Sequence, residues 1–311
     1  MGALLIMIKR KLISFDWAMK KLLRSKANFD ILEGFLSELV DEDITIIEVL
    51  ESESNKENRS DKFNLIDLKV KNQKDELIII EVQYDRELDY LQRILFGASK
   101  VITEHLNEGD PYSKIVKVIS VSIIYFDLGH GIDYVYHGTT SFTGLHKHDQ
   151  LQLSEAQQEL YQKNSTHEIF PEYYLIKVNN FDNIAKSKLD EWIYFLKNEE
   201  IKDNFKAKGL KKAKDELDIL KLPEEERIAY QRYQDDLHYQ ASMVESTYTI
   251  GLKEGEKKGI KEGKKEEREQ IASKLISANQ LDLESISEVT GLSLEQLKEL
   301  TDKNNDCDTS T

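Results

Sequence analysis

The chain has 311 residues and a formal net charge of −15 at pH 7, and 40% of its residues are hydrophobic. This length and composition fit a globular protein with a sizeable core and exclude a mainly disordered chain. The single cysteine, Cys307, excludes an internal disulfide framework and a cysteine-based structural zinc site. The negative charge argues against a general nucleic-acid binder, because nonspecific affinity comes mostly from neutralising phosphates.

The opening segment, MGALLIMIKRKL, does not have the features of a secretory signal. Its basic residues follow the six apolar residues instead of preceding them, and it has no small-residue cleavage site. No apolar run approaches the roughly 20 residues that span a bilayer. We therefore expect a cytoplasmic protein with no membrane partner.

Two helices are expected before the first strand, over residues 15–26 and 28–40, with Ser14 as the N-cap of the first. The stretch from Lys9 to Lys26 carries seven basic residues against one acid, Asp16. It could contact phosphates or form a solvated helix face that balances acidic neighbours. The sequence leaves both interpretations open.

Residues 43–51 form the first expected strand, and residues 65–85 read as a hairpin of two strands joined by a polar turn. Side chains alternate between the faces of a strand, so each of these two strands is apolar on one face only. The register that matches the apolar faces sets Leu68 beside Ile80. It also sets Asp67 opposite Glu81.

Two carboxylates that lie side by side across a sheet repel each other, so Asp67 and Glu81 need a compensating partner. A divalent cation is one such partner. The alternative is a half-exposed hairpin whose polar face is simply solvated, because short motifs of this kind often occur without function. The hairpin alone does not decide between them.

The following segments mix helices and strands in one α/β domain. We expect a helix over residues 88–107, with its apolar stripe along Leu91, Leu95 and Ala98, and strands within 114–128, 132–138 and 173–178. Beyond Phe181 only helical patterns remain. We predict five parts: a core domain (1–181), a helical extension (182–248), a charged helical linker (249–278), a two-helix unit (279–303) and a disordered tail (304–311).

The charged linker carries a glycine at every fourth position from Gly251 to Gly263. Such a tract is either an easily melted linker or a helix that another helix can approach closely. The two-helix unit should turn at Gly291, with Ser293 as the next N-cap. Because this unit is acidic, we favour docking or self-association over DNA reading, and we expect a homo-oligomer formed through the C-terminal region.

Six pieces occur in a particular order: FDWAMKKLL, IDLKVKN, LIIIEVQ, YYLIKVNNFD, DEWIYFL and the glycine-spaced tail that ends in EVTGLSLEQLKEL. In their order and spacing they resemble the Rpn-type recombination-promoting nucleases and related transposases. These belong to the PD-(D/E)xK nuclease superfamily. The resemblance covers most of the chain.

The resemblance implies an α/β fold with a PD-(D/E)xK restriction-endonuclease-like core, namely a mixed sheet of four or five strands flanked by helices, followed by a mainly α-helical C-terminal region. Asp67 and Glu81 match the acidic residues of the central hairpin. Gln83 stands where the wider superfamily has lysine, and Asp16 matches an N-terminal acidic position. Lys69 is a candidate to orient the attacking water by its position only.

The activity implied is Mg²⁺-dependent hydrolysis of DNA by an endonuclease, with other divalent cations as possible substitutes. Asp67, Glu81 and the backbone carbonyl of Val82 would hold the ion, since Mg²⁺ prefers oxygen ligands. The expected phosphate contacts are Lys20, Lys21 and Arg24. The alternative is a degenerate, weakly active or inactive nuclease core that serves as a scaffold for interaction and oligomerisation.

Overall fold

The computed structural model describes residues 12–50 and 66–308. The chain divides into two compact units, one ending at Arg232 and the other beginning at Tyr233. The predicted boundary between residues 248 and 249 falls inside a continuous helix. The five-part division of the chain stays a prediction.

In the described part of the chain, the first unit is built on one six-stranded mixed sheet in the order β1-β2-β3-β4-β6-β5. The strands β1, β2 and β3 are antiparallel neighbours, β3, β4 and β6 run parallel, and β5 is antiparallel to β6. A mixed sheet is confirmed, with six strands where four or five were expected. The strands are β1 (Ile46–Leu50), β2 (Leu68–Asn72), β3 (Leu77–Gln83), β4 (Val118–Ile124), β5 (Val135–Gly138) and β6 (Glu172–Lys177).

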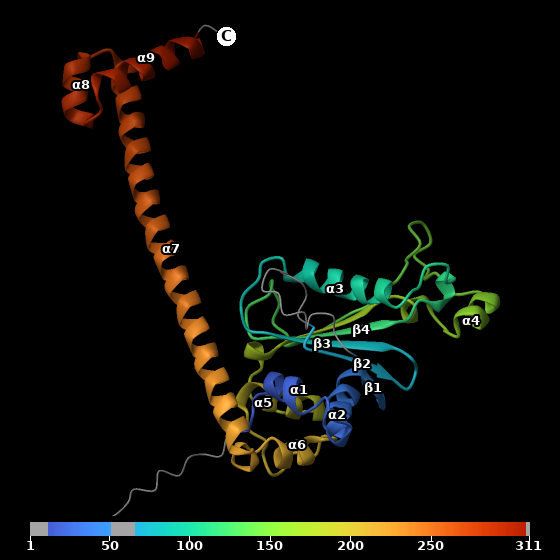
Figure 1. The fold of residues 1–311 in the computed structure, drawn as a ribbon. Coiled ribbons are helices and arrows are strands. Elements are labelled where there is room, and N and C mark those ends of the chain that lie inside the picture. Colours follow the sequence, from blue (N-terminus) through green and yellow to red (C-terminus); the bar gives the residue numbers. More distant parts are fainter. Residues whose placement is uncertain (1–11, 51–65, 309–311) are drawn as a thin grey trace, which may run out of the picture. The chain divides into compact units, whose positions relative to one another are not determined.

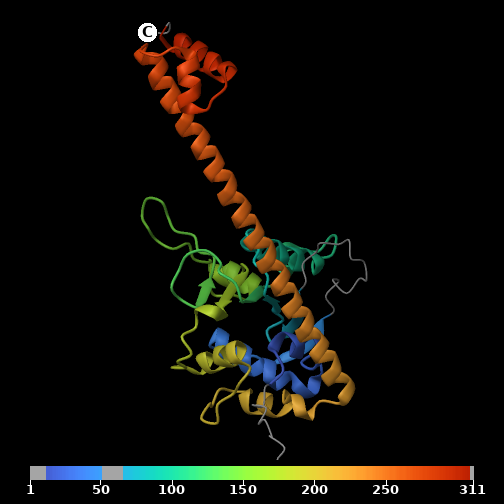
Figure 2. The same cartoon turned by 90° about the vertical axis from the view of Figure 1, so that its left-hand side faces the viewer.

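Helices cover both faces of this sheet (Figures 1 and 2). One face carries α3 (Tyr90–Glu104), and the opposite face carries α1 (Phe15–Lys21), α2 (Phe29–Val40), α5 (Lys188–Asn198) and α6 (Leu210–Glu216). The short helix α4 (Glu155–Tyr161) was not expected. The 3₁₀ turns are η1 (Lys26–Asn28), η3 (Tyr112–Lys114), η4 (Thr166–Glu168), η5 (Val178–Asn180) and η6 (Ile219–Lys221).

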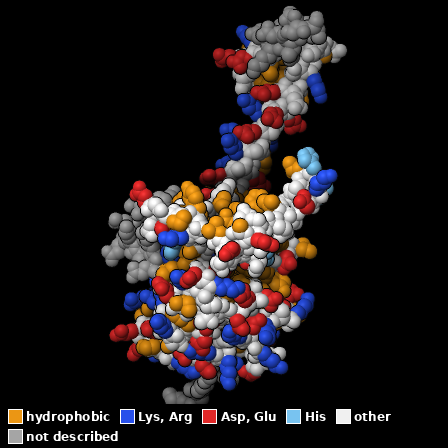
Figure 3. All heavy atoms as spheres, turned by 90° about the vertical axis from the view of Figure 1, so that its right-hand side faces the viewer, with side chains coloured by type: hydrophobic (Ala, Val, Ile, Leu, Met, Phe, Trp, Pro, Cys, Tyr) orange, Lys and Arg blue, Asp and Glu red, His pale blue; other side chains and the backbone are white. Residues whose placement is uncertain are grey.

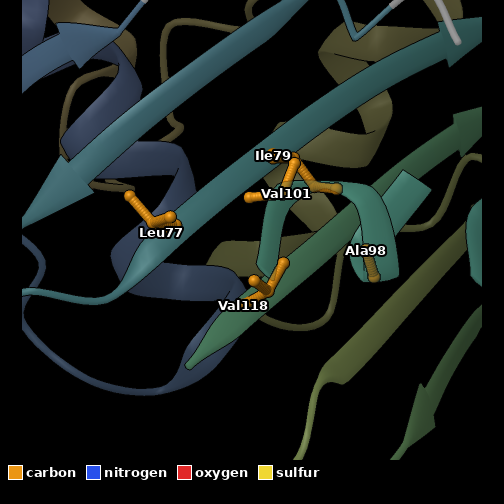
Figure 4. Packing of buried hydrophobic residues seen from close by; sticks show 5 residues of the cluster. All are labelled: Leu77, Ile79, Ala98, Val101 and Val118. Atoms are coloured by element: carbon orange, nitrogen blue, oxygen red, sulfur yellow. The ribbon is translucent and has the colours of Figure 1, made fainter. Parts of the chain in front are cut away.

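The helix α3 packs on the sheet through small and branched residues. Ala98 and Val101 meet Leu77 and Ile79 of β3 and Val118 of β4 (Figure 4). This face of β3 is the one that also carries Glu81.

The predicted apolar stripe of α3 is wrong over its first half. Leu91 and Leu95 are more than half exposed, whereas Tyr90 and Ile94 are buried. Both stripes have helical spacing, but the one that continues through Gly97 and Ala98 lets the helix backbone approach the sheet closely.

The opposite face of the sheet is covered by a helical layer with an aromatic core. Phe15, Phe35, Trp192 and Phe195 are buried and make edge-to-face contacts with ring centroids 5.3 to 6.2 Å apart. Such contacts add to the hydrophobic stabilisation of the buried rings. They join α1 and α2 to α5, which is about 150 residues away in sequence.

The helix α1 ends at Lys21, several residues before the predicted end at residue 26. Its cap also differs, because the Ser14 side chain makes no capping hydrogen bond. Instead the Ser14 N–H donates to the hydroxyl of Tyr230 at 3.0 Å. Tyr230 lies in the first turns of α7, so this part of α7 belongs to the first unit.

The C-terminal unit consists of most of α7 (Glu224–Ala278), with α8 (Leu283–Thr290) and α9 (Leu294–Asp308). The turn between α8 and α9 is as predicted. Gly291 ends α8 with φ of 67°, and the Ser293 hydroxyl accepts the N–H of Gln296. No helix within the described ranges is both long and apolar enough to cross a membrane.

Candidate active site

The β2–β3 hairpin has the register predicted from its apolar faces. Leu68 pairs with Ile80 and Val70 with Ile78 in an antiparallel ladder. Asp67 immediately precedes β2, and continuing this register by one residue sets it opposite Glu81. Glu81 lies on the face of the sheet that α3 covers, and alternation along the strand places Asp67 on the same face.

Glu81 is a nearly buried carboxylate, with a side chain 15% exposed. Its Oε1 accepts a hydrogen bond from Nη2 of Arg93, which lies on α3. The pKa of Glu81 is raised to about 7, mainly by burial and also by the negative charges of Asp67 and Glu87, against the lowering effect of Arg93. The ion pair with Arg93 therefore does not fully offset the cost of burying this charge.

Asp67 is also buried and is fixed through both its backbone and its side chain. Its Oδ2 accepts the N–H of Val82 at 2.7 Å, and its carbonyl oxygen accepts Nη2 of Arg24 at 2.9 Å. The first bond ties the carboxylate to the strand that carries Glu81. The second ties its backbone to the segment that follows α1.

Glu87 and Arg93 complete this cluster, and sequence reasoning missed both. Arg93 forms ion pairs with Glu81 and Glu87. Glu87 also accepts Nε2 of Gln83 at 3.1 Å, and Gln83 donates in addition to the carbonyl oxygen of Asp85 at 3.3 Å. Gln83 is therefore held with its amide N–H groups engaged.

A sequence signal for Arg93 does exist. A helix that follows a strand after a short loop packs back on the sheet, so its first turn returns to the end of that strand. Arg93 is in the first turn of α3, and β3 ends at Gln83.

Asp16 is buried and lies on the other side of the sheet, in the first turn of α1. Its Oδ1 accepts the hydroxyl of Tyr84 at 3.2 Å, and Tyr84 stacks on Tyr125. Burial raises the pKa of Tyr84 above its ordinary value, so this phenol stays protonated and donates to the carboxylate. Asp16 is thus joined to the end of β3 through Tyr84.

Lys69 shares the α3 face with Asp67 and Glu81, as predicted, but its ammonium group points elsewhere. The side chain is 7% exposed and pairs with Glu104 at 3.5 Å. Glu104 lies eleven residues beyond Arg93 on α3, which is about 16 Å along the helix axis. The predicted role of Lys69 in orienting water gains no support from this position.

The three predicted phosphate contacts have different surroundings. Lys21 is exposed at the end of α1. Arg24 is bound to the carbonyl of Asp67, as described above. The side chain of Lys20 lies outside the described residues, as do residues 9–11 of the basic stretch. Their role in DNA binding stays a prediction.

The donor set suits a hard divalent cation. Asp67, Glu81, Glu87 and Arg93 together carry two excess negative charges when all four are ionised. No group of three or more His, Cys, Asp or Glu residues in the described ranges is arranged to hold a metal. Mg²⁺ is commonly bound by one or two carboxylates while it keeps several waters, so Asp67 and Glu81 fit this ion.

The mixed sheet, its central hairpin with two opposed carboxylates and the flanking helices define a PD-(D/E)XK nuclease core. The chain belongs to this family: the model described as PD-(D/E)XK nuclease family transposase matches residues 13–247. The resemblance seen in the sequence is therefore confirmed. No curated protein and no solved structure shows significant similarity to the chain.

Proposed function

We propose that the protein is a DNA endonuclease that depends on a divalent metal, with Mg²⁺ as its ion, of the recombination-promoting nuclease and transposase type. Nucleases of this family generally use divalent metal ions. The observation that carries the proposal is the closeness of Asp67, the residue just before β2, to Glu81 of β3: Asp67 accepts the N–H of Val82, and its charge raises the pKa of Glu81.

In this proposal Asp67 and Glu81 hold the ion through carboxylate oxygens, and the backbone carbonyl of Val82 is a further ligand. When bound, the ion neutralises charge on the phosphate and makes a water molecule a better nucleophile at neutral pH. The N–H of Val82 fixes the Asp67 carboxylate at 2.7 Å, which supports its role as a preset ligand.

Gln83 orients the attacking water in this scheme. The Nε2 group of Gln83 already donates to Glu87 and to the carbonyl of Asp85. The side-chain oxygen of Gln83 is therefore the atom that can accept a hydrogen bond from the water. An amide orients a nucleophile but does not remove its proton. The proton therefore goes to another group or to solvent.

The proposal is tested by conversion of a supercoiled plasmid to nicked and linear forms by the full-length protein. Cleavage should require added Mg²⁺ and stop when EDTA is present in excess. Mn²⁺ and Ca²⁺ in parallel reactions define which ions substitute. Absence of cleavage with every ion would refute the endonuclease proposal.

A second candidate is a nuclease-fold scaffold without efficient catalysis. The ion pair between Arg93 and Glu81 favours it, because the guanidinium already compensates a carboxylate that a metal would use. In that case the protein would bind divalent ions weakly, and cleavage would be absent while the fold and the assembly remained.

We further propose that the C-terminal unit mediates self-association. Between Gly251 and Gly263, a Cβ on any of the four glycines would meet no other atom within 4 Å. Packing within the described chain therefore does not explain these glycines. A helix from a second copy of the chain could pack closely against them. Cytoplasmic location also stays a prediction.

A further inference from the structure

A groove of about 690 Å³ in the C-terminal unit is lined mainly by cations. It lies where the turn between α8 and α9 meets α7, beside a small core of Ala272, Ile286, Leu292 and Leu297. Gly291 leaves space for Arg268, whose Nη1 lies 3.8 Å from where a Cβ would stand. The charged lining residues are Lys258, Lys261, Lys264, Lys265, Arg268 and Glu262.

These cations are poorly compensated by the protein itself. Lys258 pairs with Glu262 at 3.8 Å and Lys265 with Glu269 at 3.7 Å, and both pairs are largely exposed. Exposed pairs of this kind contribute little. The other three, for which the described part of the chain offers no carboxylate within 4 Å, are Lys261, Lys264 and Arg268.

The arrangement also has a cost for the helix. Lys261 and Lys265 are four residues apart, as are Lys264 and Arg268, so each pair lies on one face of α7. Like charges at this spacing repel each other and destabilise the helix. A bound anion would remove this repulsion.

A second basic run is compensated more extensively, because three of its five lysines have a carboxylate partner. In residues 206–214, Lys208 pairs with Asp43 at 2.9 Å, Lys212 with Asp30 at 2.6 Å, and Lys214 with Asp203. Acidic and basic side chains are likewise interspersed over the face of the first unit that Figure 3 presents. The groove therefore holds more cations without a close carboxylate than this run does.

We propose that this cationic groove binds the phosphate backbone of DNA. From Lys258 to Arg268 the helix rises about 15 Å, enough to follow several successive phosphates of one strand. Apart from the buried Leu292, the groove has no apolar side chain to anchor a protein partner. The choice of DNA as the polyanion rests on the proposed function, but the site is separate from the cleavage site.

Contacts of this kind position a nucleic acid without reading its sequence. The groove would therefore hold substrate independently of Asp67 and Glu81. Binding should be insensitive to DNA sequence and strongly sensitive to salt.

The test uses the full-length protein with Asp67→Asn, so that DNA stays intact. Its binding to a fluorescent duplex is measured by anisotropy titrations at several salt concentrations.

One variant adds Lys261→Gln, Lys264→Gln and Arg268→Gln. The matched control adds Lys253→Gln, Lys274→Gln and Lys298→Gln, which remove the same charge from exposed positions of the same unit outside the groove. Glutamine keeps helix propensity close to that of lysine and arginine, and circular dichroism verifies helicity.

The groove variant should bind roughly tenfold more weakly or worse, with its log–log salt slope reduced in magnitude by about 2.7, because three phosphate contacts are lost. The control should change much less in both quantities. Equal effects in the two variants, no effect in the groove variant, or no DNA binding by the parent protein would each overturn the inference. Plasmid cleavage by the protein with Asp67 restored is scored separately, so a failure of the proposed nuclease activity is distinguished from a failure of the groove.

Discussion

Three competing influences determine whether the carboxyl group of Glu81 is ionised. Burial and the neighbouring charges of Asp67 and Glu87 disfavour its ionised form, while Arg93 favours it. The net result is a raised pKa, which means that a single guanidinium is not sufficient compensation. A divalent cation carries the additional positive charge that this cluster lacks.

Arg93 is therefore expected to compete with the metal for Glu81. Arg93→Gln should tighten binding of Mg²⁺ or Mn²⁺ by on the order of tenfold, because a positive charge next to the ligands is removed. Isothermal titration calorimetry of the metal-free protein measures this directly. The control is Arg86→Gln, an exposed residue of the loop between β3 and α3. Weaker binding by Arg93→Gln would show that Arg93 positions Glu81 and does not compete.

The raised pKa of Glu81 also predicts how stability depends on pH. A carboxyl group whose pKa rises from 4.5 to about 7 on folding stabilises the protein below pH 4.5, and this contribution is lost as the pH rises through 7. The shift corresponds to roughly 3 kcal/mol. Glu81→Gln mimics the neutral form and should not suffer this loss.

Urea unfolding without metal, at pH 4.5 and at pH 8, measures the effect. The free energy of unfolding of Glu81→Gln should gain roughly 3 kcal/mol relative to the wild type between these two pH values. The exposed Glu108→Gln serves as control and should track the wild type. A difference that stays constant with pH would contradict the raised pKa.

At the scale of elements, the sequence predicted the central hairpin well. Its two strands are apolar on one face each, so only a few registers bury both faces, and Leu68 pairs with Ile80 as expected. The apolar stripe of α3 was predicted wrongly because its exposed leucines also recur at helical spacing. Glu87 and Arg93 were missed because their roles depend on how α3 packs on the sheet, which periodicity does not specify.

Close packing between α2 and the segment before α6 depends on Gly34. A Cβ at this position would lie 2.1 Å from the carbonyl oxygen of Lys208, so the backbone would have to shift. Gly34→Ala should lower the free energy of unfolding by about 1 to 3 kcal/mol, the usual cost of overpacking.

The matched control is Gly255→Ala, another helical glycine whose added methyl group meets nothing within 4 Å. It should leave the first unit unchanged or stabilise α7 by up to about 1 kcal/mol. Chemical denaturation monitored by tryptophan fluorescence reports on the first unit, since Trp17 and Trp192 are both buried in it. Equal stability of Gly34→Ala and the wild type would contradict the packing described.

At the scale of the whole molecule, the two compact units suggest separate tasks. A chain that ends at residue 250 keeps Tyr230 and its contacts with Ser14 and Trp17, so the first unit should stay folded. If the C-terminal unit drives self-association, light scattering should show a lower oligomeric state for this truncated chain. An unchanged oligomeric state would move the interface to the first unit.

The central claim is that Asp67 and Glu81 form a metal-dependent phosphodiesterase site. It is tested most directly by plasmid cleavage in Mg²⁺ with wild type, Asp67→Asn and the control Asp75→Asn. Asparagine at 67 keeps an acceptor for the N–H of Val82 but loses the charge. Asp75 lies in the exposed hairpin turn with φ of 60°, which asparagine tolerates.

Cleavage should fall by on the order of 100-fold or more in Asp67→Asn, because the charge stabilisation from a well-bound ion is worth several kcal/mol. Far-UV circular dichroism and the unfolding midpoint should stay close to those of the wild type. Asp75→Asn should cut at the wild-type rate. Full Mg²⁺-dependent cleavage by Asp67→Asn would contradict the account.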